Sequence, residues 1–190
     1  MKALRTAAAA ALLLAIAVLA ARTDAATSNN ERRFYSARAG VGIEAPPGWT
    51  LSTHTGYPSI LCLLVHPGGS RVSLAVDAAV TARDAAALAE ESRPGLAAQG
   101  IEVTAVGAGP RGGALLDARL ARRNQAIRQL YLVRPVEGNP PTRQAIVLTL
   151  TTSAPDLPAA GAAFDWVIAR LDLEAPVRLD EKRERPDAGL

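Results

Sequence analysis

The feature that most constrains this chain is a series of short segments in which apolar and polar residues alternate, joined by tight turns. Residues 70–78 place Val72, Leu74 and Val76 at every second position, which is typical of a strand with one buried face. Residues 59–66 come just before it, across a Pro-Gly-Gly turn that fits type II geometry. Because only antiparallel neighbours can be joined by such short turns, we expect a largely antiparallel sheet.

A second hairpin is predicted from residues 114–121 and 127–134, with a polar turn between them. Alternation in its second strand places two apolar sets on opposite faces, Leu130 and Leu132 on one and Ile127, Tyr131 and Val133 on the other.

Further strands are expected at residues 41–45, 101–107 and 143–152. The strand at 101–107 should run through Ile101, Val103 and Ala105. Residues 59–66 are apolar on both alternating faces, so this strand should be covered on both sides.

Two helices are predicted. Thr81, three residues before Asp84, resembles a capping box at the start of the first helix. Pro94 should break or kink this helix, and Gly100 should end it. Its buried face should consist of Ala85, Leu88, Ala89 and Ser92.

The second helix should follow Ser153 and Asp156, either of which can cap it. It carries an apolar stripe at helical spacing, formed by Phe164, Val167, Ile168 and Leu171. The predicted class is therefore α+β, a largely antiparallel sheet flanked by helices on both faces.

The N-terminal residues 1–26 have the pattern of a secretory signal peptide. Lys2 and Arg5 precede an uncharged, almost wholly apolar run at residues 6–21, and small residues follow at spacings that a signal peptidase accepts. An uncleaved membrane anchor is the alternative, but the run is short for a stable span. We therefore expect a periplasmic or secreted bacterial protein with no stable membrane span after cleavage.

The rest of the chain divides into a linker, one domain and a tail. Residues 27–33 are a polar linker, residues 34–174 form the α/β domain, and residues 175–190 form a charged tail that is expected to be disordered. At 190 residues with 49% hydrophobic and 21% charged content, the chain fits a single globular domain.

Charge and cysteine content exclude several classes of function. Of the 21 basic and 18 acidic residues, three and one lie in residues 1–26, which leaves 18 − 17 = +1 for the remainder. Such near-neutral balance gives little attraction for nucleic acid. The single cysteine, Cys62, excludes an intrachain disulfide and a Cys-rich metal site, and we predict no metal and no cofactor.

The best candidate binding residues are four arginines around the tip of the second hairpin: Arg119, Arg122, Arg123 and Arg128. They can form a docking patch for an acidic partner or anionic headgroups, or only a solvated turn. Trp166, one step off the apolar stripe of the last helix, is a second candidate contact residue. No clustered catalytic set is visible, so we predict that the protein is not an enzyme.

The segment Gly42-Ile43-Glu44-Ala45-Pro46-Pro47-Gly48-Trp49 resembles the PsbP-like superfamily, with its short strand followed by a turn and a tryptophan. That group includes the photosystem II extrinsic protein PsbP, periplasmic DcrB-type proteins and a Ran-binding nuclear import factor. The resemblance covers residues 34–174. It implies an α/β/α sandwich without catalytic residues, in proteins that bind partners or assist assembly.

Three functional hypotheses follow. The first is an exported non-enzymatic binding or envelope assembly-assisting module with a protein partner. The second is a periplasmic domain that binds a small apolar ligand between sheet and helix, and the third is a hydrolase with a Ser or Asp nucleophile. The sequence leaves the partner and the oligomeric state open.

The signal-peptide hypothesis predicts the mass of the exported protein. When the full chain is expressed in a bacterium with an outer membrane, the mature N-terminus should lie between residues 21 and 27. Intact mass spectrometry of the exported material measures this directly. Exported material that retains Met1 would contradict the hypothesis.

Overall fold

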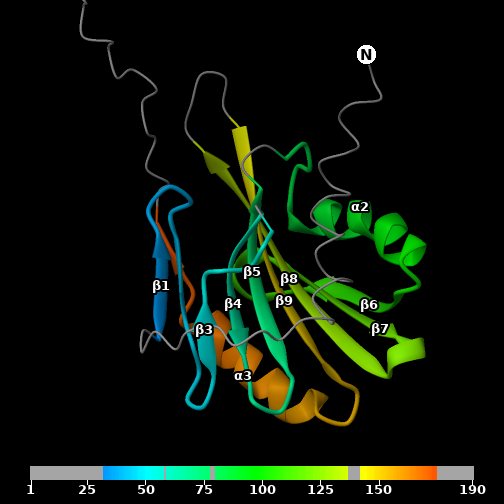
Figure 1. Cartoon of the computed structure of the whole chain (residues 1–190). Coiled ribbons are helices and arrows are strands. Elements are labelled where there is room, and N and C mark those ends of the chain that lie inside the picture. Colours follow the sequence, from blue (N-terminus) through cyan, green and yellow to red (C-terminus); the bar gives the residue numbers. More distant parts are fainter. Residues whose placement is uncertain (1–31, 58, 78–79, 137–141, 175–190) are drawn as a thin grey trace, which may run out of the picture.

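The computed structural model describes residues 32–57, 59–77, 80–136 and 142–174 (Figure 1). The predicted signal peptide at 1–26, most of the linker at 27–33 and the charged tail at 175–190 lie outside the described residues. None of the described helices is long and apolar enough to cross a bilayer.

The described strands are β1 (Arg33–Ser36), β2 (Val41–Glu44), β3 (Thr50–Ser52), β4 (Ile60–Val65), β5 (Arg71–Asp77), β6 (Glu102–Ala108), β7 (Ala114–Leu120), β8 (Gln125–Val136), β9 (Thr142–Ser153) and β10 (Asp172–Leu173). The helices are α2 (Ala85–Ala98) and α3 (Leu157–Ala169), with short 3-10 turns η1 (Pro110–Gly112) and η2 (Ala121–Arg123).

Seven strands form the main sheet in the order β3-β4-β5-β9-β8-β7-β6, and every neighbouring pair is antiparallel. The longest pair, β8 with β9, runs in unbroken register from Gln125 opposite Ser153 to Val136 opposite Thr142. The predicted antiparallel α+β class is confirmed.

The alternation in β8 divides the core into two layers. Leu130 and Leu132 join one apolar cluster, which contains α3, whereas Ile127 and Tyr131 join another, which contains α2. Figure 1 shows the two helices on opposite sides of the sheet. The predicted assignment of these β8 side chains to faces is therefore confirmed.

Helix α3 buries the stripe that its sequence predicts. Phe164, Val167 and Ile168 are fully or almost fully buried, and Leu171 is buried just after the helix ends. At its start, the Ser153 hydroxyl donates to the Asp156 carboxylate over 2.6 Å. Asp156 occupies the N-cap position without capping the helix through its side chain.

Helix α2 differs from the prediction in its N-cap, and it continues past Pro94 without a break. Asp84, not Thr81, is the N-cap: its backbone is extended and its carboxylate accepts the Ala87 amide over 2.8 Å. Pro94 does not end the helix, because its ring lies on the exposed side while Leu88 and Leu96 anchor the turns around it. Gly100 ends the helix with a positive φ of 74°, as predicted.

Strand β6 falls at the strand predicted for residues 101–107, whereas the prediction that residues 59–66 are covered on both sides is wrong. A register shift between Val103 and Ala105 turns Ala105 out to solvent, so Val106 packs on the core in its place. Strand β4 is fully buried on one face only, because α2 packs on β6, β7 and β8 and leaves Leu63 and Val65 half-buried.

A smaller sheet of order β1-β2-β10 packs beside α3 in the same cluster, and β1 begins at Arg33, inside the predicted linker. Arg134 joins it to the main sheet. Its guanidinium donates to Gln144 Oε1 on β9 over 2.8 Å and to the carbonyls of Ala39, Gly40 and Glu174. Burial lowers the pKa of Arg134, a cost that these four hydrogen-bonded partners offset.

The packing of α3 predicts a large loss of stability when its most buried ring is removed. Phe164→Ala should lower the free energy of unfolding by about 3–5 kcal/mol, because it leaves a cavity between α3 and the sheet. Ala162→Ser, on the exposed side of the same helix, should change it by less than about 0.5 kcal/mol. Urea denaturation followed by circular dichroism measures both, and equal effects would contradict the two-layer packing.

Candidate functional site

The hairpin tip between β7 and β8 is built by the 3-10 turn η2 and by Asn124. Asn124 has a left-handed backbone with φ 48°, a conformation that asparagine tolerates better than most residues. Its amide donates to the Ala121 carbonyl and its carbonyl accepts the Ala154 amide, which fixes the tip against the chain that leaves β9.

Two of the four predicted arginines are neutralised by carboxylates directly opposite them on neighbouring strands. Arg119 lies opposite Glu102 and bonds to it over 2.8 Å, and Arg128 lies opposite Asp117 and bonds to it over 2.7 Å. The Asp117 hydrogen bond raises the pKa of Arg128. Cross-strand pairs of this kind stabilise a sheet, so these two arginines have a structural role in the described fold.

The other two arginines lie in η2 and have no carboxylate partner among the described residues. Arg122 donates to the backbone carbonyl of Gln99, just past the end of α2, over 3.3 Å. Arg123 is exposed, and no ion pair of its guanidinium forms within the described chain. We call Arg122 and Arg123 the tip arginines. The predicted cluster therefore separates into one paired half and one unpaired half.

Trp166 lies apart from the tip arginines, near the other end of β7. It is half-buried against the α3 cluster, and the Arg170 guanidinium lies 4.0 Å from its ring centroid. Arg111, in η1 before β7, donates to the Ala169 carbonyl at the end of α3. The structure does not bring Trp166 and the hairpin tip into one site.

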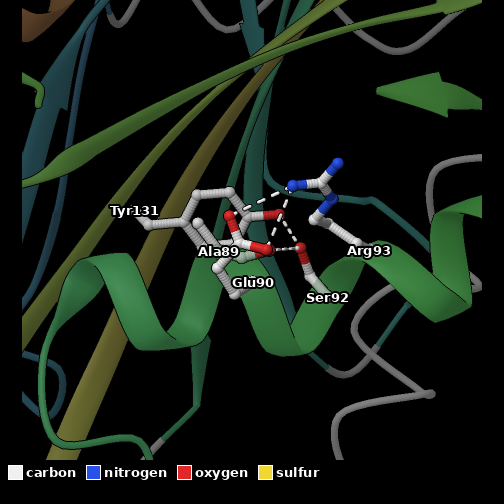
Figure 2. Close-up of polar contacts among 5 residues, drawn as sticks. All are labelled: Ala89, Glu90, Ser92, Arg93 and Tyr131. Carbon is white, nitrogen blue, oxygen red and sulfur yellow. Dashed lines mark hydrogen bonds and ion pairs between the residues drawn. The ribbon is translucent and has the colours of Figure 1, made fainter. Parts of the chain in front are cut away.

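A buried chain of polar groups beneath α2 was not predicted as a unit, and Figure 2 shows the part of it formed by Ala89, Ser92 and Tyr131. The Ser92 hydroxyl donates to the Ala89 carbonyl and lies 2.9 Å from the Tyr131 hydroxyl. Tyr131 donates to Gln129 Oε1 over 2.6 Å, and the Gln129 amide donates to the Thr149 hydroxyl. The chain thus connects α2 through β8 to β9.

The chemistry of this polar chain is that of a structural network. Burial raises the pKa of Tyr131 to about 12, so its hydroxyl stays protonated near neutral pH and cannot act as a general base there. Ser92 therefore has no base in this network that would activate it. The only signal in the sequence was a serine within the apolar stripe of α2.

The remaining candidate groups are also separate. Cys62 is buried, and desolvation raises the pKa of its thiol to about 12. His66 is exposed at the β4–β5 turn, where its Nδ1 accepts the Gly68 amide and its ring lies 5.4 Å from that of Trp49. Within the described residues, no group of three His, Cys, Asp or Glu side chains could hold a metal ion.

Comparison with known proteins identifies a neighbour by structure only. No family model and no curated protein matches the chain. Among solved structures, it is similar to the solution structure of cyanobacterial PsbP (CyanoP) from Synechocystis sp. PCC 6803, at 12% identity and a TM-score of 0.47. The match covers 82% of this chain and 99% of that chain.

The polar chain predicts a stability loss that depends on pH. Tyr131→Phe should lower the free energy of unfolding by about 1–3 kcal/mol near neutral pH, because buried polar partners lose a hydrogen bond. Since folding raises the pKa of Tyr131 from 10.0 to about 12, the stabilisation is complete below pH 10 and is lost as the pH rises towards 12.

The difference in stability between wild type and Tyr131→Phe should therefore shrink over that interval. Urea titrations at several pH values measure it, with Tyr57→Phe as the control. A difference that grows with pH would contradict the network.

Proposed function

We propose that this chain is an exported, non-enzymatic binding or envelope assembly-assisting module that docks an acidic protein partner at the tip arginines. The observation that carries the proposal is the contrast within one hairpin. Arg119 and Arg128 are neutralised by Glu102 and Asp117, whereas Arg122 and Arg123 have no carboxylate partner among the described residues.

The geometry of the tip supports recognition of carboxylates. Guanidinium groups bind carboxylates through paired hydrogen bonds, which gives direction as well as charge attraction. The tip is held by Asn124 and by the Arg122–Gln99 contact, so a partner would order little of the protein when it binds.

A protein partner accounts for this surface better than a membrane does. Each basic residue near an anionic bilayer contributes about 1 kcal/mol, so two arginines would supply only about 2 kcal/mol. That is too little for stable adsorption without a wider basic face. Near-neutral charge in the rest of the chain does not supply one.

Export and the absence of catalysis are part of the proposal. Export is inferred from the signal-peptide pattern of residues 1–26. The non-enzymatic role is supported by the use of the Ser92 and Tyr131 hydroxyls in the buried chain. The space between α2 and the sheet is occupied by side chains such as Leu88, Leu96 and Tyr131, so no observation favours the small apolar ligand.

Removing the tip arginines should weaken binding of an acidic peptide. The probe is a fluorescent peptide of glycine and glutamate with blocked ends. Arg122→Gln/Arg123→Gln should reduce its affinity about tenfold or more, and added salt should reduce wild-type affinity. Fluorescence anisotropy measures both effects.

The matched control is Arg38→Gln/Arg143→Gln, which removes the same charge from two exposed residues. Arg143 lies near the end of the β8–β9 pair that is opposite the tip, and Arg38 precedes Ala39, whose carbonyl accepts from Arg134 of β8. Equal loss in both double variants would mean unspecific charge attraction and would overturn the proposal. Binding of wild type to anionic phosphatidylglycerol vesicles, but not to the peptide, would also overturn it in favour of a membrane surface.

A further inference from the structure

Strand β6 is an edge strand of the main sheet, and no described residue pairs with its outer side. Five of its seven residues are exposed, and from Thr104 onwards they are small: Thr104, Ala105, Gly107 and Ala108. A strand in this position presents unpaired backbone amides and carbonyls to its surroundings.

The two edges of the sheet are protected differently. The strand at the opposite edge, β3, has only three residues. A short edge strand offers few backbone groups with which another chain can pair. Strand β6 has seven residues, no lysine and no proline, and its single charge, Glu102, is paired with Arg119. Its bulge lies near the start, between Val103 and Ala105, so residues 105–108 remain in regular pairing with β7.

The hydrogen-bond pattern shows which backbone groups point outward. The Gly109 amide donates to the Gly113 carbonyl over 2.8 Å at the β6–β7 turn. Because hydrogen-bonded and non-hydrogen-bonded pairs alternate along antiparallel strands, Gly107 and Ala105 face β7 in the same way. The amides of Val106 and Ala108 therefore point away from the sheet.

We propose that the outer edge of β6 binds an extended segment of the partner protein as an eighth strand of the sheet, with acidic residues at the ends of that segment. This inference rests on the proposed function and specifies its partner. Arginines lie near both ends of the edge: Arg122 bonds to Gln99 beside the start of β6, and Arg111, which donates to the Ala169 carbonyl, is in the turn that follows its end.

The same arginines disfavour a second copy of this chain as the occupant. Antiparallel pairing of two β6 edges would bring Arg122 and Arg123 of one copy towards Arg111 of the other. Parallel pairing would bring the tip arginines of both copies together. Either arrangement places like charges near each other, whereas an acid-ended segment places opposite charges there.

The test compares two blocked peptides with glutamates at both ends, one with a glycine core and one with a core of alternating threonine and valine. The full chain should bind the threonine–valine peptide about tenfold or more tightly than the glycine peptide. Ala108→Pro removes an outward amide and should abolish that preference, while Ala108→Thr keeps the amide and should retain it.

Hydrogen exchange measured by NMR gives a second readout. Saturating threonine–valine peptide should slow exchange of the Val106 and Ala108 amides at least tenfold and leave the Ala105 amide, already bonded to β7, little changed. Thermal melting of each variant shows whether it is folded. If Ala108→Pro melts at a lower temperature than wild type, strand addition is tested by the exchange measurement on wild type alone.

The outcomes separate the two proposals. Loss of binding in Arg122→Gln/Arg123→Gln, with no preference between the peptides and no amide protection, would overturn strand addition and leave acidic docking intact. Failure of both peptides to bind would overturn both. Sedimentation that shows a dimer in wild type but not in Ala108→Pro would assign the edge to a second copy and overturn the foreign segment.

Discussion

The fixed register between β8 and β9 determines the rest of this structure. Over twelve residues of β8, the alternation of side chains sends Leu130 and Leu132 to the α3 layer and Tyr131 to the α2 layer. A slip of one residue would exchange the two sets and remove the apolar surface on which each helix packs. Both layers, and the strands added outside the central pair, therefore depend on this pairing.

Features set by residues close in sequence could be predicted, because their causes are local. The stripe of Phe164, Val167 and Ile168 and the glycine that ends α2 were both visible in the chain. The cap of α2 was misplaced because Thr81 and Asp84 both suit an N-cap, and only the backbone conformation selects Asp84. The outward turn of Ala105 was not predictable, because a bulge depends on how β6 meets β7.

The candidate site shows the same limit for contacts between distant residues. The sequence identified the four hairpin arginines, but their separation into a paired and an unpaired half depends on the register that places Asp117 and Glu102 opposite two of them. The role of Arg134 was hidden for the same reason, since its partners are carbonyls of residues far away in the chain. Every residue has a backbone carbonyl, so residue types do not indicate which carbonyls an arginine will bind.

The arginine contacts at the two ends of β7 limit how this protein can be re-engineered. Arg111 holds the last turn of α3 and Arg122 holds the carbonyl just past α2, so each turn beside β7 is attached to a different helix. Opening the chain at either turn, for circular permutation or insertion of a reporter domain, would detach a helix end from the sheet. The β4–β5 turn, whose residues 66–69 are all exposed, is the better position for such an insertion.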